Sequence, residues 1–117
     1  MQQPFLADAV RVDTFHLVSA LDAYAVAATR LVERWFDADA YADVQRRIDT
    51  IRDHGVTQPA LTVLSLQLVI AHAELVSTLW QNASADVSAA HLQEVRARHA
   101  VAVELLRAGS AQLQRSE

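Results

Sequence analysis

The chain contains no cysteine among its 117 residues. Disulfide bonds, cysteine-ligated zinc, iron–sulfur clusters and thiol catalysis are therefore excluded together. Lysine is absent as well, so all ten basic side chains are arginines, which is typical of proteins from GC-rich bacterial genomes. The first eleven residues lack the basic segment and apolar core of a secretory signal. We therefore expect a cytoplasmic protein.

Glycine and proline are scarce, with two of each, so the chain has few places to turn. A composition rich in alanine, leucine, arginine and glutamine favours long helices. The longest strongly apolar stretch, 61–70, is interrupted by Thr62, Ser65 and Gln67. It is too short and too polar to cross a bilayer, so we expect no membrane partner.

Basic charge is also in deficit, with ten arginines against fourteen acidic residues, a net charge of −4 and a pI near 5.6. Electrostatic attraction to phosphates supplies most of the non-specific affinity for nucleic acids. The arginines alternate with aspartate and glutamate and do not form a basic stripe. We therefore expect no nucleic-acid partner.

Apolar residues recur at helical spacing in four segments, which predict helices at about 7–36, 38–54, 58–82 and 86–114. No linker divides the chain, so we expect a single domain over residues 1–117. Short connections place successive helices antiparallel. The expected fold is an all-α, antiparallel up-down-up-down four-helix bundle with unequal helix lengths. The third helix is apolar over most of its circumference and is expected to be the most buried.

Turn residues separate these segments. Asp37 and Asp39 are candidate N-caps for the second helix. Gly55 is expected just after that helix in the left-handed conformation, followed by Thr57 as the cap of the third helix and Pro59 in its first turn. Ser84 or Asp86 is expected to cap the fourth helix.

His72 and His99 lie on the apolar faces of the third and fourth helices. In an antiparallel hairpin their heights differ by about 5 Å. We expect both to be buried and hydrogen-bonded, because an unpaired buried imidazole is costly. Two readings stay open. The pair is structural, or it is a buried metal, haem or small-molecule site. The Glu-x-x-His tetrapeptides of carboxylate-bridged metal sites are absent, so no metal and no cofactor is the primary expectation.

His16 is expected on the outer face of the first helix, beside small residues. An exposed histidine on an acidic helical bundle of this size resembles a histidine phosphotransfer (HPt) domain. The resemblance covers residues 16–20, His-Leu-Val-Ser-Ala, and implies that His16 accepts a phosphoryl group. The family places lysine and then glycine shortly after its histidine, where this chain has serine and alanine, so the charge that stabilises phosphohistidine is missing.

Unequal helix lengths suggest an interface. The second helix is expected to be short, so the third overshoots its start by roughly 14 Å and exposes apolar side chains there. Large exposed apolar patches usually mark interaction surfaces. The predicted interface consists of Trp35, Phe36, Val76, Leu79 and Trp80. Our primary hypothesis is a non-enzymatic protein–protein interaction module, regulatory or scaffolding, that forms a homodimer and can bind another protein.

Overall fold

Four long helices make up the chain in the computed structural model, which describes residues 4–82 and 88–115. They are α1 (Pro4–Glu33), α2 (Ala38–Thr57), α3 (Thr62–Asn82) and α4 (Ala89–Arg115). A short 3-10 helix, η1 (Pro59–Leu61), precedes α3. The described residues contain no strand. The expected all-α four-helix bundle is confirmed.

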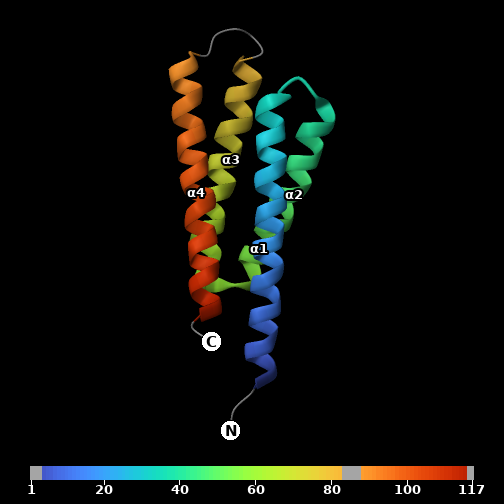
Figure 1. Cartoon of the computed structure of the whole chain (residues 1–117), viewed down its shortest axis with the longest axis vertical. Coiled ribbons are helices and arrows are strands. Elements are labelled where there is room, and N and C mark those ends of the chain that lie inside the picture. The colour runs from blue at the N-terminus through green and yellow to red at the C-terminus, as the bar shows by residue number, and fades with distance from the viewer. Residues whose placement is uncertain (1–3, 83–87, 116–117) are drawn as a thin grey trace.

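The helices lie side by side along a molecule 62 Å long and 25 by 18 Å across. In Figure 1 the chain runs up α1, down α2, up α3 and down α4, so successive helices point in opposite directions. The packed pairs are α1 with α2, α2 with α3, α3 with α4, and α4 with α1. The first turns of α1 project beyond the other helices at the lower end of the figure.

The turn between α1 and α2 follows the expected chemistry. Asp37 is the N-cap of α2, and its carboxylate accepts a hydrogen bond from the Asp39 amide at 2.9 Å. The Asp37 amide donates in turn to the Arg34 carbonyl at 2.9 Å. α1 nevertheless ends at Glu33, three residues earlier than expected, because the chain already turns at Arg34.

Gly55 plays a different part from the one expected of it. α2 continues to Thr57, so Gly55 is a buried residue within the helix and Thr57 is not the cap of α3. A Cβ atom at position 55 would lie 2.6 Å from both Cβ and Oγ of Ser65. The glycine is therefore required because α2 and α3 approach closely there, and not because of a left-handed turn.

Pro59 begins η1, where its missing N–H group costs nothing, as expected. At the other end of the hairpin, the Ser88 hydroxyl accepts a hydrogen bond from the His91 amide at 3.1 Å and so caps α4. The expected caps Ser84 and Asp86 lie outside the described residues.

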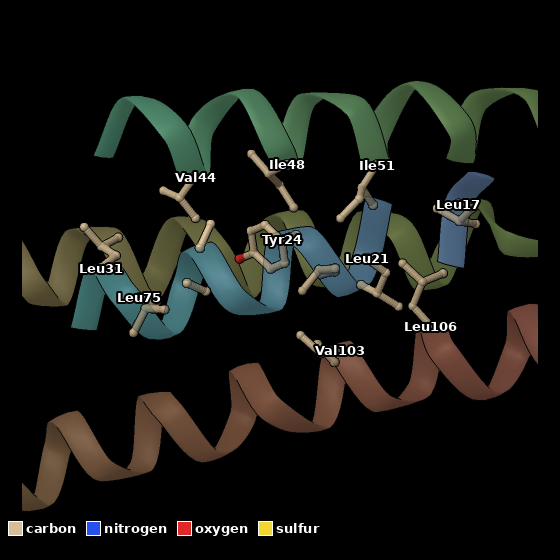
Figure 2. Close-up of a cluster of buried hydrophobic side chains, with 14 of the residues drawn as sticks. Leu17, Leu21, Tyr24, Leu31, Val44, Ile48, Ile51, Leu75, Val103 and Leu106 are labelled. Carbon is tan, nitrogen blue, oxygen red and sulfur yellow. The ribbon is translucent and has the colours of Figure 1, made fainter. Parts of the chain in front are cut away.

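The core is built from one stripe of each helix, and Figure 2 shows its central part. Leucines of α1 face valine and isoleucine side chains of α2, with α3 and α4 closing the other sides. The largest fully buried side chains are Tyr24, Leu17, Leu21, Leu31, Ile51, Leu61, Leu68, Leu75, Leu79, Leu106, Val44 and Val95. Tyr24 stands in the middle of this set (Figure 2), and it is the feature that positions the site.

Two helical segments are long and apolar enough to cross a membrane by length and composition alone, Thr14–Glu33 and Pro59–Asn82. Core helices of globular proteins meet the same criterion. For the second segment only 28% of the tested window is buried, which shows how much of the apolar surface of α3 faces outward. The corresponding window of Thr14–Glu33 in α1 is 33% buried, so α3 is not the most buried helix that we expected.

Candidate functional site

Three polar rings meet inside the core. Tyr24 of α1 lies between His72 of α3 and His99 of α4. Its hydroxyl oxygen is 3.0 Å from Nδ1 of His72 and 2.6 Å from Nε2 of His99. Tyr24 is fully buried, and the histidines are 6% and 8% exposed. The two histidines are therefore buried and hydrogen-bonded, as expected, but through a tyrosine that joins them.

The directions of the two hydrogen bonds in this Tyr24–His72–His99 cluster depend on each other. A phenol carries one hydrogen, so Tyr24 donates to one imidazole and accepts from the other. O–H donors make shorter hydrogen bonds than N–H donors. On that basis we assign Tyr24 as the donor to His99 Nε2 and His72 Nδ1–H as the donor to Tyr24. The hydrogen of neutral His99 is then on Nδ1, and Nε2 of His72 carries a lone pair.

Burial keeps the cluster neutral. It raises the pKa of Tyr24, so the phenol stays protonated. Burial lowers the pKa of His99 to about 4, with a further contribution from repulsion by a charged His72. The pKa of His72 is also lowered by burial, while the carboxylate of Asp49 acts in the opposite direction. At neutral pH the three rings therefore form an uncharged hydrogen-bonded chain.

Each histidine also borders a groove on one side of the bundle. His99 lines a groove of about 230 Å³ between α1 and α4, the His99 groove, with Ala25, Ala28, Thr29, Val32, Leu75, Arg96, Ala100, Val103 and Glu104. His72 lines a groove of about 350 Å³ between α2 and α3, the His72 groove, with Gln45, Ile48, Asp49, Arg52, Val69, Ala73, Val76 and Ser77. The cluster thus connects two opposite sides of the molecule.

Metal binding was the other reading of the two histidines. No group of three or more histidine or carboxylate side chains among the described residues is placed to hold a metal ion. The ring nitrogens that face each other across the cluster are already engaged with the Tyr24 hydroxyl. A cation there would displace these hydrogen bonds in an apolar surrounding, which disfavours it.

A second unusual surface lies on the outside of α3 and α4. Its members are large apolar side chains that are 47–68% exposed: Val63, Leu66, Ile70, Val101 and Leu105. We call this surface the α3/α4 face. A groove of about 440 Å³ follows it and is bordered by Gln67, Ala71, Ala97, Ala102 and an ion pair between Glu74 and Arg98. The shortest distance in that ion pair is 2.7 Å.

The residues predicted as an interface are divided between core and surface. Leu79 is 1% exposed and belongs to the core, and Val76 and Trp35 are half-buried against it. α2 has 20 residues and not the expected 17, so the excess length of η1 and α3 over α2 shrinks to about 6 Å. That longer helix explains why Leu79 is covered.

Phe36 and Trp80 remain on the surface, 74% and 61% exposed. The Trp80 ring stacks on Tyr41 of α2, with ring centres 5.2 Å apart. Phe36 packs edge-on against Trp35 at 5.8 Å. Each of these two side chains therefore already has an aromatic neighbour within its own chain.

His16 is exposed on α1, as expected for a phospho-acceptor. Its nearest ring neighbour is Phe15, 6.1 Å away between ring centres. Phe15 is itself 61% exposed. The described residues around His16 supply no cationic side chain with a hydrogen bond or ion pair to it.

Two features of the site escaped the sequence analysis. Tyr24 was visible only as one member of the apolar stripe of α1, and its spacing carries no sign of a polar contact. The α3/α4 face left a clear signal, the nearly all-round apolar character of 61–80, which was interpreted as burial. Comparisons of the chain with protein-family models, with curated proteins and with solved structures find no match. Its function must therefore be inferred from the geometry.

Proposed function

We propose that the chain is a non-enzymatic helical-bundle interaction module, and that two copies associate through the α3/α4 face. The observation that carries the proposal is the exposure of five large aliphatic side chains on the outer side of α3 and α4. Ile70, Val101 and Leu105 line one groove. Val63 and Leu66 precede Ile70 by seven and four residues, which places them on the same side of α3. Exposed aliphatic residues scattered singly are ordinary, whereas a contiguous exposed patch usually marks an interaction site.

The composition of the surface fits a second copy. Each α3/α4 face has an aliphatic centre and a polar rim of Gln67, Glu74 and Arg98, the arrangement that specific protein interfaces show. In a twofold arrangement the same patch is used on both molecules, so each apolar centre meets another and each rim meets a rim.

The Phe36 and Trp80 end of the bundle is the alternative surface. It is less suitable because Trp80 is stacked on Tyr41, and Phe36 on Trp35, within the same chain. The α3/α4 face has no such cover among the described residues. It also lies along two packed helices, α3 and α4, and is not confined to one end of the bundle.

Sedimentation velocity at tens of micromolar tests the proposal. We expect a species of twice 12.9 kDa for the native chain. Ile70→Glu places a charge in the centre of the face and should convert the dimer into a monomer. Val26→Glu is the matched control, since Val26 is 62% exposed on α1 and Ile70 is 68% exposed on α3. The control should sediment as the native chain does.

The other surfaces and partners are outcomes of the same experiment. A dimer that survives Ile70→Glu and is lost in Trp80→Glu would place the interface at the end of the bundle. A native monomer that floats with phosphatidylcholine–phosphatidylglycerol vesicles would assign the face to lipid. A native monomer that ignores vesicles would remove self-association from the proposal.

A further inference from the structure

We infer that the His99 groove is a binding site for a small organic monocarboxylate with a compact apolar body. The inference concerns the side of the bundle formed by α1 and α4, and it does not depend on the proposed association through α3 and α4. It rests on a buried imidazole with one unused nitrogen, a nearby arginine, and space left by alanines.

The imidazole of His99 supplies the first polar contact. The ring is more than nine-tenths buried and lines the groove. Nε2 is held by the Tyr24 hydroxyl at 2.6 Å. Nδ1 makes no hydrogen bond within the described part of the chain. Because Tyr24 donates to Nε2, the hydrogen of neutral His99 is on Nδ1. Nδ1 is not among the fully buried side-chain atoms that lack a hydrogen-bond partner, so its N–H group is accessible to an acceptor that enters the groove.

Arg96 supplies the charge. It lies one turn before His99 on α4, and its side chain also lines the groove. Among the described residues it has no hydrogen-bond or ion-pair partner. An arginine guanidinium matches a carboxylate in shape and in hydrogen-bond geometry. Arg96 and His99 Nδ1–H together therefore present donors suited to one carboxylate.

Glu104 limits the ligand to a single carboxylate. It borders the same groove eight residues after Arg96, which is about 12 Å further along α4. Its carboxylate is 3.5 Å from the guanidinium of Arg107. Arg107 is also paired with Asp22, so these three side chains together carry a net negative charge, opposite to that of Arg96. A second carboxylate at the Glu104 end of the groove would therefore be repelled.

The walls of the groove determine the body of the ligand. Ala25 and Ala28 of α1 face Ala100 and Val103 of α4 across it, with Leu75 at its floor. The volume of about 230 Å³ is below the range of pockets for drug-sized ligands. A ligand of the size of benzoate, with one carboxylate and a single apolar ring, suits both the space and the donors.

Binding in this groove has a consequence on the opposite side. A carboxylate that accepts a hydrogen bond from His99 Nδ1–H fixes Nε2 as the acceptor of the Tyr24 hydrogen. Tyr24 must then accept from Nδ1–H of His72, because it has no second hydrogen to donate. Nε2 of His72 is left as a lone pair beside the His72 groove. Binding therefore keeps the tautomers of the unoccupied cluster, and the protein is already arranged to accept the carboxylate.

Titration of the native chain with benzoate tests the inference, observed by long-range proton–nitrogen NMR of ¹⁵N-labelled histidine. We expect saturable shifts of His99, and a His72 ring that keeps its hydrogen on Nδ1 before and after benzoate is added. Benzamide, the neutral analogue, should bind at least tenfold more weakly. Arg96→Gln changes an exposed side chain, so the fold should be kept while benzoate affinity falls at least tenfold.

A pair of alanine variants provides the steric control. Ala25→Leu fills the His99 groove and should abolish the shifts. Ala73→Leu adds the same atoms beside the His72 groove and should leave benzoate binding unchanged. Ile70→Glu should bind benzoate like the native chain, so the outcome is separable from that of the association experiment. Equal binding of benzamide, equal binding by Ala25→Leu, or no saturable shift at tens of millimolar benzoate would each overturn the inference.

Discussion

The centre of the bundle and its α3/α4 face both depart from the usual pattern of an apolar interior and a polar surface. The centre holds three polar rings where apolar side chains are the rule, and the face exposes aliphatic side chains where polar ones are the rule. The two differ in how far the chain itself compensates. Tyr24, His72 and His99 satisfy one another by hydrogen bonds, whereas no described residue covers the face. The centre is thus complete within one molecule, and the face is not.

The outer side of α2 shows that the chain can form an ordinary solvent-facing surface. Asp43 lies 2.9 Å from Arg46 and 3.4 Å from Arg47, and Asp49 lies 3.2 Å from Arg52. Such exposed pairs at helical spacing contribute little to stability, but they keep a helix face soluble. α3 has no comparable charged face, so its apolar exterior is a specific property of that helix.

Removal of the bridging hydroxyl should produce the largest effect. Tyr24→Phe leaves Nδ1 of His72 and Nε2 of His99 without their partner in the core. Each buried, unsatisfied polar group costs about 1–3 kcal/mol, so we expect a loss of about 4 kcal/mol in the free energy of unfolding. Urea denaturation monitored by circular dichroism measures it.

Two controls separate hydrogen bonding from packing. In His99→Leu, Tyr24 can still donate to His72, so the loss should be below about 1 kcal/mol, apart from the effect of the new shape. The triple variant Tyr24→Phe, His72→Leu, His99→Leu has no polar ring left and should be more stable than Tyr24→Phe alone. If Tyr24→Phe matches the native chain in stability, the hydrogen-bonded cluster does not exist.

Acid should weaken the centre selectively. The pKa of His99 is lowered from 6.5 to about 4 on folding, so the unfolded chain binds more protons between these values. The stability contributed by the neutral ring is fully present above pH 6.5 and is lost as the pH falls toward 4. A pKa lowered by that amount corresponds to a loss of about 3 kcal/mol in the free energy of unfolding once His99 is fully protonated. Burial lowers the pKa of His72 as well and adds in the same direction.

The pH dependence is measured as the urea midpoint between pH 7.5 and 4. The triple variant without the polar rings should lose distinctly less stability over this interval than the native chain. The α3/α4 face contains one carboxylate, Glu74, which is paired with Arg98 at its rim, so Ile70→Gln should follow the native pH profile. Parallel profiles for the native chain and the triple variant would contradict the assignment of neutral buried histidines.

A smaller effect is expected at Gly55, where α2 and α3 approach closely. Gly55→Ala would bring a methyl group within 2.6 Å of the Ser65 Cβ atom, which cannot rotate away. Overpacking of this kind costs about 1–3 kcal/mol. Ser65→Ala is the comparison, because its Oγ is buried without a hydrogen-bond partner among the described residues. That variant should be neutral or more stable in thermal denaturation, while Gly55→Ala should melt earlier.

The fold could be predicted from the sequence because it depends on periodic features. Steps of three and four residues, an aspartate N-cap at position 37 and a proline at position 59 act locally, and each behaves as expected. The end of α2 could not be predicted, because Gly55 serves a contact with Ser65 ten residues later. The local sequence around a glycine does not distinguish a turn from a close approach of two helices.

The candidate site was predictable in part. The burial and hydrogen bonding of His72 and His99 follow from their places on apolar faces, and their proximity follows from the antiparallel hairpin. The joining residue, Tyr24, comes from 48 and 75 positions away. The spacing of apolar residues in a helix is the same whether or not the hydroxyl of a tyrosine among them is hydrogen-bonded. The register between hairpins, which sets that pairing, is a tertiary property.

Val101→Gln should have the smallest effect on the stability of the monomer. It therefore best separates the contribution of the α3/α4 face to association from its contribution to folding. Val101 is 57% exposed, so the substitution buries no polar group and opens no cavity in the monomer. At nanomolar concentration, where the chain is monomeric, we expect the free energy of unfolding to change by less than about 0.5 kcal/mol.

At tens of micromolar the native chain gains stability from association, because only folded chains form the dimer. Val101→Gln should lack most of that gain. Thermal midpoints measured across this concentration range therefore diverge between the two proteins. Parallel curves would show that the exposed aliphatic residues have no partner in a second copy of the chain.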